Sequence, residues 1–330
     1  MSVEWESRHA AVTGVAGYRP VNSLSNSELI SSRDLDSSDD WVRRRTGIIS
    51  RRLAGSAETL EVMGAHAALE AARRAGVDTG DVDCVLVASM SHRDPEHSVA
   101  RAVADRLPGR PRAAFDVNAA CAGFCAALEM ARCLIAGGTF DRVLVVGAER
   151  MSDIVDPGDR STSPIFADGA GAALVTVAAE PGIAAPAWGS DGSGADLLTC
   201  RADPADEKDG WEPGFLRMQG PELYRWVMGH VPEVAGAAVR RAGITVADLG
   251  AFIPHQANDR MVRGLATALR LPDTVAVSHD VAHTGNTSAA SIPLAMTALL
   301  DESPHLSGEL ALLIGFGAGL SYAAQVVRLP

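Results

Sequence analysis

Lysine is nearly absent from this chain, because Lys208 is the only lysine among 29 lysine and arginine residues. Acidic residues number 41, which gives a net charge of −12. A chain with this excess of negative charge is a poor partner for nucleic acid or for an anionic membrane surface, so neither is expected as a ligand. Arginine carries almost all of the positive charge and can still form a local basic patch.

Cysteine, aromatic residues and long apolar runs are also scarce. The five cysteines are odd in number, form no CxxC pair and follow no secretory leader, so we expect a reducing cytoplasm and no metal site. No apolar run reaches the roughly 18 residues that a membrane span needs. Aromatic residues make up 5% of the chain while alanine and glycine are plentiful, which indicates helices packed closely on sheets.

Two stretches of the sequence echo each other. Ala71–Ser89 and Ala238–His255 both have the pattern of a helix, an Ala-Gly pair, a short loop with Asp and an apolar strand. Gly76 and Gly243, which follow the two predicted helices, are 167 positions apart. A constant offset through helix, turn and strand indicates an internal duplication. The sequence therefore predicts two related halves, residues 1–180 and residues 181–330.

Short apolar runs alternate with helical patterns along the chain. Several runs are apolar at every position, as strands must be when both faces of a sheet are covered. The alternation predicts an α/β fold with mainly parallel pairing. Strands are predicted at Cys84–Ala88, Ala113–Val117, Arg142–Gly147, Ala172–Val177, Ala251–Pro254, Thr274–Val277, Leu310–Ile314 and Ser321–Val327.

The strongest chemical signal surrounds Cys121. A predicted strand ends at Val117, a turn of small residues follows, and a helix is predicted to begin at or just after Cys121. A thiol at a helix N-terminus meets unpaired N–H groups and the positive end of the helix dipole, which favour the thiolate over a free cysteine with a pKa of about 8.5. The position fits a nucleophile, although a buried structural cysteine is the commoner role. Ser288, 167 positions further on, opens the matching helix of the second half.

Three further motifs lie in the second half. His255 directly follows an apolar strand, where α/β folds place functional groups, but a core or capping role fits it equally well. Asn286 lies in a Gly-rich turn before a helix that its side chain could cap. The backbone of Gly315–Gly319 could line an oxyanion hole or form a tight hairpin.

Taken together, this order of Cys, His, Asn and Gly-rich turn resembles that of the thiolase superfamily, and specifically of 3-oxoacyl-[acyl-carrier-protein] synthase III. CAGF surrounds the cysteine, and PHQAN, TGNTSAASIPLAM and IGFGAGLSYA follow in the family's order. SSDDWVRRRTGIISRR and DPGDRSTSPIFADGAGAA match further family blocks, so the similarity runs nearly end to end. The resemblance implies a thiolase fold, with duplicated halves in a five-layered αβαβα arrangement, and a homodimer.

The resemblance also implies the chemistry, a decarboxylative Claisen condensation in fatty acid or polyketide initiation. Cys121 would take the acyl group of an acyl-CoA primer, and backbone N–H groups of Cys121 and Ala318 would form the oxyanion hole. His255 and Asn286 would donate hydrogen bonds to the carbonyl of a malonyl thioester and so stabilise the enolate left by loss of CO₂. That carbanion would attack the acyl-cysteine, with no metal and no permanently bound cofactor.

Two sets of residues would bind the carriers of the acyl groups. In the family's pattern the indole of a tryptophan stacks on the adenine of coenzyme A, and the implied contacts here are Trp41, Arg45, Thr46, Arg160 and Asn258. An acyl carrier protein is acidic, and a local basic cluster would steer it to the site. The implied docking residues are Arg225, Arg260, Arg263 and Arg270.

The segment Ser91–Ser98 departs from the family's pattern. Relatives have a longer and more apolar loop here, which closes the acyl pocket of the partner subunit. The charged side chains of this segment are poor walls for an alkyl chain. They are Arg93, Asp94, Glu96 and His97.

This departure keeps a second function open. An acyltransferase of secondary metabolism would also load Cys121, but would pass the acyl group to an alcohol, an amine or a carrier protein. A degradative thiolase is disfavoured because it needs a second catalytic cysteine, and no cysteine follows Cys200. A non-catalytic partner subunit is disfavoured because such subunits typically lose the nucleophile.

Overall fold

Two five-stranded sheets form the centre of the computed structural model, which describes residues 8–94, 96–200 and 214–330. The first sheet has the order β1-β7-β6-β4-β5. Its strands are β1 (His9–Tyr18), β7 (Asp168–Ala178), β6 (Arg142–Arg150), β4 (Cys84–Ala88) and β5 (Ala113–Val117). The second sheet has the order β8-β14-β13-β11-β12. Its strands are β8 (Ala187–Ser190), β14 (Ser321–Arg328), β13 (Leu310–Gly317), β11 (Ala251–Pro254) and β12 (Ala276–Val277).

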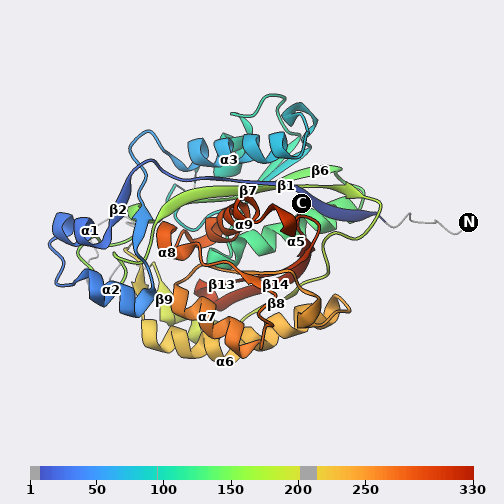
Figure 1. Ribbon diagram of the computed structural model, residues 1–330. Helices are drawn as coiled ribbons and strands as arrows, with labels where there is room; N and C mark the ends of the chain where they lie inside the picture. Colours follow the sequence, from blue (N-terminus) through green and yellow to red (C-terminus); the bar gives the residue numbers. More distant parts are fainter. Residues whose placement is uncertain (1–7, 95, 201–213) are drawn as a thin grey trace, which may run out of the picture.

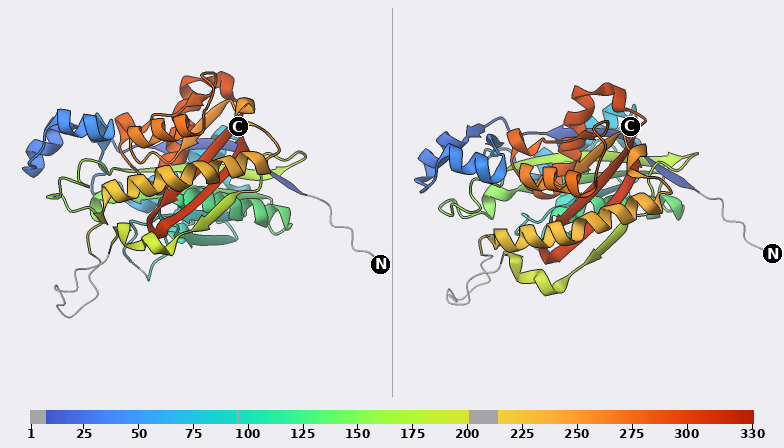
Figure 2. Two further views of the ribbon diagram at one scale, coloured as in Figure 1. Left: turned by 90° about the horizontal axis from the view of Figure 1, so that it is seen from below. Right: turned by 60° about the horizontal axis from the view of Figure 1, so that its bottom comes forward.

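Helices fill three layers around these sheets, as Figure 1 shows. The outer layer on the first sheet holds α3 (Leu60–Arg74) and α4 (Val99–Ala104). The layer between the sheets holds α5 (Gly123–Ala136) and α9 (Ser291–Glu302), which follows the short α8 (Val281–Thr284). The outer layer on the second sheet holds α6 (Gly220–Arg241) and α7 (Asp259–Ala268), which Figure 2 shows across that sheet. The predicted five-layered αβαβα fold is confirmed.

The central layer is apolar because α5 is hydrophobic on nearly every side. Phe124, Leu128 and Ile135 of α5 are fully buried and belong to one core cluster with residues of both sheets. Alanine makes up much of the remaining helix surface, so the two sheets can approach α5 closely.

The duplication is visible in the backbone as well as in the order of the strands. Gly76 and Gly243 both adopt positive φ, +67° and +73°, at the ends of matching helices. The 3₁₀ turns η2 (Ala120–Ala122) and η7 (Ser288–Ala290) precede α5 and α9, and their first residues have φ of +47° and +48°. The turns begin 168 positions apart, so Ser288 matches Ala120. The constant offset of 167 had predicted that it would match Cys121, and that prediction is wrong.

The strands of the first sheet all precede residue 180, and those of the second all follow it. However, α9 of the second half packs against β1 and β7 of the first sheet. The division into 1–180 and 181–330 as separate units therefore stays a prediction.

The prediction of mainly parallel pairing is wrong. Among the strands of the described residues, parallel pairs are limited to β4 with β5 and β6, and β11 with β12 and β13, whereas β7 and β14 run antiparallel to both of their neighbours. The reason is clearest after β13, where the turn Ala318–Leu320 returns the chain directly beside the same strand. Gly319 has φ of +111° there, and a turn this short can join only antiparallel strands. The edge strands β1 and β8 were not predicted.

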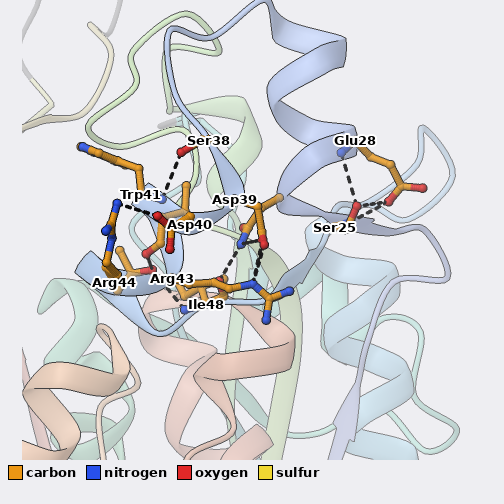
Figure 3. A network of polar contacts seen from close by, with 12 residues as sticks. Ser25, Glu28, Ser38, Asp39, Asp40, Trp41, Arg43, Arg44 and Ile48 are labelled. Atoms are coloured by element: carbon orange, nitrogen blue, oxygen red, sulfur yellow. Dashed lines mark hydrogen bonds and ion pairs between the residues drawn. The ribbon is translucent and has the colours of Figure 1, made fainter.

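A small N-terminal unit carries Trp41 beside this double sheet. It consists of β2 (Ser23–Ser25), α1 (Asn26–Arg33), α2 (Asp39–Thr46) and β3 (Ser50–Arg52). The Ser25 hydroxyl and Glu28 form a capping box on α1, and the Ser38 hydroxyl accepts a hydrogen bond from the Trp41 N–H at 3.2 Å (Figure 3). These caps fix where both helices begin, and therefore the direction in which the first turn of α2 presents its side chains.

The remaining strands, β9 (Leu198–Thr199) and β10 (Arg217–Met218), form a short antiparallel pair. Within the described parts of the chain, no helix is both long and apolar enough to cross a membrane.

Candidate active site

A cavity of about 860 Å³ is lined by residues from both halves of the chain. Cys121, His255 and Asn286 line it and are 3%, 2% and 4% exposed. The three come from separate segments: the turn before α5, the end of β11 and the turn before α9. Folding therefore brings together the three residues that the motifs had singled out.

Cys121 sits in η2, where the chain turns from β5 into α5. The end of β13 lies against it, because a Cβ added to Gly317 would come within 2.7 Å of the Cys121 backbone nitrogen. Only glycine allows this approach. The Gly317–Ala318 backbone thus runs beside Cys121, as an oxyanion hole made of the Cys121 and Ala318 N–H groups requires. That role of the two N–H groups stays a prediction.

The prediction that Cys121 favours the thiolate is wrong for this structure. Burial, with a smaller contribution from the carboxyl of Glu149, raises the pKa of the Cys121 thiol to about 12. The helix does begin at Gly123, as predicted, but removing the charge from water costs more than the helix N-terminus returns. The sequence could not reveal this because the groups that cover the thiol are distant along the chain.

His255 is held by its ring Nδ1, which lies 2.8 Å from the Ser291 hydroxyl. That hydroxyl also accepts a hydrogen bond from the Gln256 N–H at 3.3 Å, so its own proton is available to Nδ1. The ring packs edge-on against Phe316, with centroids 5.2 Å apart. Burial lowers the pKa of His255 to about 3, so the imidazole is neutral at physiological pH. With the Ser291 proton on the Nδ1 side, Nε2 carries the ring proton and can donate.

Asn286 is fixed through both its backbone and its side chain. Its backbone N–H donates to Ile165 at 2.9 Å, and its carbonyl accepts from Ala167 at 2.9 Å. The side-chain oxygen accepts from the Ser288 N–H at 2.8 Å, which closes a local turn before η7. Because the oxygen is used in this way, the amide NH₂ is the end left to donate to a substrate. The N-caps of η7 and α9 are Thr287 and Ala290, and neither helix has a side-chain cap, so the capping role considered for Asn286 is wrong.

The glycine before Asn286 explains the TGN motif. Gly285 has φ of +74°, and a Cβ at this position would lie 2.8 Å from the Cβ of Ala167. Both conditions exclude larger residues. The turn is therefore built for close packing, and the direction of the Asn286 side chain follows from it.

Two arginines contact the Trp41 ring at another part of the cavity wall. The guanidinium carbons of Arg45 and Arg160 are each 4.7 Å from the centre of the Trp41 ring. Arg160 is also paired with Asp36 at 3.2 Å. An indole flanked by cations is suited to an anionic ligand with a flat ring, as a nucleotide is.

Thr46 and Asn258, the other two residues predicted to bind coenzyme A, also line the cavity. The Thr46 hydroxyl donates to the Val42 carbonyl at 2.7 Å. The Asn258 side-chain oxygen caps α7 by accepting from the Met261 N–H at 2.9 Å, which leaves its NH₂ group as a donor. All five predicted coenzyme A contacts therefore share one cavity with Cys121.

The four arginines predicted to dock a carrier protein do not lie together at the cavity. Arg225 and Arg260 line it, whereas Arg263 and Arg270 do not. Two of the four have acidic partners on their own helices. Arg225 pairs with Glu222 at 2.6 Å, and Arg263 pairs with Asp259 at 2.6 Å. These pairs reduce the positive charge that the surface presents.

The charged side chains of the segment Ser91–Ser98 have two different kinds of partner. Pro95 of this segment lies outside the described residues. Asp94 pairs with His97 at 2.6 Å, with both side chains largely exposed. Arg93 turns the other way, and its Nη2 lies 3.4 Å from the Gly214 carbonyl.

The positive charge of Arg93 also acts on Cys200. Burial raises the pKa of Cys200, and the positive charge of Arg93 opposes that rise. Cys200 in turn raises the pKa of Cys121, so the two thiols lie within range of each other. Arg93 does not itself line the cavity that holds Cys121, and its link to the nucleophile runs through Cys200.

Sequence reasoning missed Glu149, a fully buried carboxyl beside the site. Its signal was a charged residue near the end of the apolar run RVLVVGAER, which forms β6. It also missed Ser291, which orients His255. A serine in an alanine-rich helix start is common as a cap, so the sequence provided no reason to connect it with histidine.

The layered fold and the buried cysteine, histidine and asparagine define a condensing enzyme of the thiolase fold. A family model described as 3-Oxoacyl-[acyl-carrier-protein (ACP)] synthase III matches residues 115–192, and its C-terminal counterpart matches residues 239–329. The chain is 42% identical over 324 residues to the beta-ketoacyl-[acyl-carrier-protein] synthase III of Streptomyces glaucescens, covering 98% of this chain and 97% of that protein. The chain belongs to the 3-oxoacyl-[acyl-carrier-protein] synthase III family.

Other relatives agree over nearly the whole length. The mycobacterial beta-ketoacyl-[acyl-carrier-protein] synthase III of Mycobacterium avium is 44% identical over 319 residues, covering 96% of this chain and 94% of its own. The crystal structure of the priming beta-ketosynthase of the R1128 polyketide pathway has a TM-score of 0.94 at 42% identity, covering 100% and 98% of the two chains. The Aquifex aeolicus synthase III has a TM-score of 0.88 at 36% identity, covering 97% and 99%. The predicted activity, condensation in fatty acid or polyketide initiation, is confirmed at this level.

Proposed function

We propose that this enzyme loads an acyl primer from coenzyme A onto Cys121 and condenses it with a malonyl group carried by an acyl carrier protein. The observation that carries the proposal is the shared cavity, in which Cys121, His255 and Asn286 stand with all five predicted coenzyme A contacts. In chemical terms the loading step makes the enzyme an acyltransferase, and the second step makes it a ketosynthase.

In the first step the Cys121 sulfur attacks the carbonyl carbon of the acyl-CoA thioester. The negative charge that develops on the carbonyl oxygen is stabilised by the backbone N–H groups of Cys121 and Ala318. Trp41, flanked by Arg45 and Arg160, binds the nucleotide end of coenzyme A. The acyl group remains on sulfur and coenzyme A leaves.

In the second step His255 and Asn286 act on the malonyl thioester. The neutral imidazole donates from Nε2 and the amide donates from its NH₂ group, both to the thioester carbonyl oxygen. Loss of CO₂ leaves an enolate whose charge these donors stabilise. The carbanion attacks the acyl carbon and forms the new carbon–carbon bond, while the bond from that carbon to the Cys121 sulfur breaks and frees Cys121 for the next cycle. A neutral histidine suits this role, because it donates a hydrogen bond without a competing charge.

This chain has one candidate surface for the carrier protein and another for a partner subunit. Arg225 and Arg260 at the cavity edge are suited to an acidic acyl carrier protein, and Arg263 and Arg270 lie further along α7 and just beyond it. For a homodimer, β5 is an open sheet edge whose Phe115 is 50% exposed. All five cysteines are free, which supports action in the cytoplasm.

Intact-mass spectrometry tests the proposal. The protein is incubated with acetyl-, malonyl-, butyryl- or octanoyl-CoA, and a mass increase equal to the acyl group is expected with at least one of them. Malonyl carrier protein is then added, and CO₂ and a 3-oxoacyl carrier protein are expected. Cys121→Ala is the control, and acyl loading by that variant would remove Cys121 from the mechanism.

The same experiment distinguishes the alternative function. An acyltransferase that uses an alcohol or amine would give the first mass increase but would release no CO₂ with malonyl carrier protein. Absence of any acyl-enzyme with the whole panel would contradict both functions.

A further inference from the structure

Arg51 is a fully buried arginine outside the cavity that contacts two segments of the site. It lies on β3 opposite Leu24 of β2 and has no exposed surface. Its guanidinium donates to the Leu24 carbonyl at 3.1 Å, to the Pro164 carbonyl at 2.9 Å and to the side-chain oxygen of Asn26. All three acceptors are neutral, and no carboxylate forms an ion pair with Arg51 within the described parts of the chain.

The charge of this guanidinium makes its hydrogen bonds strong. Burial, with a smaller contribution from the charge of Arg33, lowers the pKa of Arg51 to about 10, so the group is still protonated at pH 7. Hydrogen bonds from a charged donor are roughly twice as strong as those from a neutral one. A cation buried without an ion pair is costly, so its presence calls for an explanation in what it holds.

The Pro164 carbonyl connects Arg51 to Asn286. Pro164 lines the cavity, and the carbonyl of the next residue, Ile165, accepts the hydrogen bond of the Asn286 backbone N–H at 2.9 Å. The Asn286 carbonyl accepts from the Ala167 N–H at 2.9 Å. Residues 164–167 are therefore one short stretch of backbone, which Arg51 holds at one end and along which Asn286 pairs.

The strand of Arg51 also contacts the turn that carries Asn286. A Cβ added to Gly285 would come within 2.9 Å of the Arg51 Cβ, so the two backbones are in direct contact. The Ser50 hydroxyl, one residue before Arg51, donates to the His283 carbonyl at 3.0 Å. Asn286 is thus held by β3 from two directions, through its backbone partner and through the glycine before it.

Asn26 fixes the other side of the guanidinium. Asn26 is fully buried, and its NH₂ group donates to the Asp39 carboxylate at 2.7 Å and to the Ile48 carbonyl at 2.8 Å. Both partners are acceptors, so the amide oxygen is the end that accepts from Arg51. Asp39 begins α2, and Ile48 lies just beyond its C-terminus. The guanidinium is therefore anchored to the two ends of the helix that carries Trp41.

We propose that Arg51 is a positioning residue for malonyl decarboxylation, because it holds Asn286 in the direction that its donor role requires. The role rests on the function proposed above. Arg51 does not line the cavity, so it acts through residues 164–167 and not on substrate. Cys121 lies on another segment, and the ring of His255 is held by Ser291. The effect should therefore be confined to the second step and leave acyl loading intact.

Arg51→Lys tests the role with the charge retained, because one ammonium group cannot replace three hydrogen bonds of a planar guanidinium. The kcat for CO₂ release from malonyl carrier protein should fall about 10- to 100-fold, the effect of misplacing a group by about 1 Å. The KM for the carrier protein and the rate of acyl loading should change less than about twofold. Arg52→Lys is the matched control, since Arg52 donates to the Pro20 and Val21 carbonyls and should keep both rates.

A double-mutant cycle separates positioning from a general loss of structure. If Arg51 acts through Asn286, Arg51→Lys should cause no further loss of CO₂ release in the Asn286→Ala background, where the side chain to be positioned is gone. Two independent effects would multiply. A multiplied loss would overturn the proposal, and so would an equal fall of acyl loading and CO₂ release in Arg51→Lys.

Asn26→Ala is the second variant, because it leaves Arg51 in place but removes the acceptor that orients its guanidinium. It should lower CO₂ release and spare acyl loading, even if Arg51→Lys does not fold. Failure of both variants to fold would assign Arg51 to the fold alone and overturn the proposal.

The same measurements keep this role distinct from the proposed function. If Asn286→Ala lowers CO₂ release but folded Arg51→Lys does not, the positioning role is contradicted while the proposed function stands. If Asn286→Ala releases CO₂ like the wild type, the function proposed for Asn286 fails, whatever the behaviour of Arg51→Lys.

Discussion

At the residue scale, burial determines the charge of the groups in the cavity. It raises the pKa of Cys121 to about 12 and lowers that of His255 to about 3, so both are neutral at pH 7 before substrate binds. A neutral histidine with its Nδ1 directed to a serine is a hydrogen-bond donor, not a base. This division leaves His255 free for the role proposed for it, which is to donate a hydrogen bond to the malonyl carbonyl.

His255→Ala and Asn286→Ala should each form the acyl-enzyme at close to the wild-type rate but lose malonyl decarboxylation by about 10²–10³-fold, the cost of removing one donor to a developing oxyanion. Two measurements separate the steps. Acyl loading is quenched at set times and measured by mass spectrometry, and decarboxylation is measured as CO₂ release from malonyl carrier protein. A variant that folds and binds coenzyme A but fails to load would show that the role assignment is wrong.

At the scale of elements, α2 positions the Trp41 ring. Its N-terminus is capped by Ser38, and its C-terminus ends at Gly47 with φ of +75°. Arg45 approaches the Trp41 ring from the same helix, and Arg160 approaches it from the segment between β6 and β7. The proposed nucleotide site therefore depends on three groups from two segments.

Trp41→Ala should raise the KM for acyl-CoA by about tenfold, because stacking of a base on an aromatic ring contributes about 1–3 kcal/mol. Loading from an acyl thioester of N-acetylcysteamine, which lacks the nucleotide, should be unchanged. Arg44→Ala is the control, since Arg44 is exposed on the same helix and pairs with Asp40 (Figure 3). Equal loss with both thioesters would contradict a role in binding the nucleotide.

The loop Ser91–Ser98 is the second element with a consequence for function. Arg93 turns towards Gly214 and influences Cys200, which in turn influences Cys121. We expect the positive charge of Arg93 to disfavour a long alkyl chain at the acyl site and to favour a short one, or one that ends in a carboxylate.

Arg93→Leu should therefore shift the order of kcat/KM towards butyryl- and octanoyl-CoA and away from acetyl- and malonyl-CoA. Arg101→Leu, which removes an exposed arginine of α4, should leave the order unchanged. Efficient octanoyl transfer by the wild type, or an unchanged order in Arg93→Leu, would remove Arg93 from primer selection.

At the scale of the whole molecule, the open edge of the first sheet bears on assembly. β5 has β4 on one side only, and its Phe115 presents an exposed aromatic ring. Unprotected sheet edges with apolar side chains tend to pair. A second copy of this chain is the partner that the proposed homodimer requires.

Phe115→Asp should convert a dimer into a monomer, because it puts a negative charge at the centre of a contact that already joins two acidic chains. Light scattering coupled to size-exclusion chromatography measures the mass. Val21→Asp is the control, since Val21 is 83% exposed on another part of the surface. A dimer that survives Phe115→Asp would show that the contact lies elsewhere.

The local pattern of the sequence was sufficient to predict most strands of the two sheets and the three residues at the centre of the site. Short apolar runs that alternate with helical patterns predicted eight strands, and each is present, with β12 shorter than expected and β6, β7, β13 and β14 longer. The motifs identified Cys121 and Asn286 because each lies at a turn of small residues before a helix, and His255 because it directly follows an apolar strand. Information of this kind is local, so it survives without knowledge of the fold.

Tertiary structure alone decided the charge states and the buried contacts. The pKa of Cys121 depends on groups such as Glu149 and Ser288, which are far from it in sequence, and the hydrogen bond from Ala289 to Glu149 joins residues 140 positions apart. Strand direction also depended on how β7 and β14 return beside their neighbours. Burial and electrostatics are sums over everything that surrounds a group, and a sequence does not list those neighbours until the chain has folded.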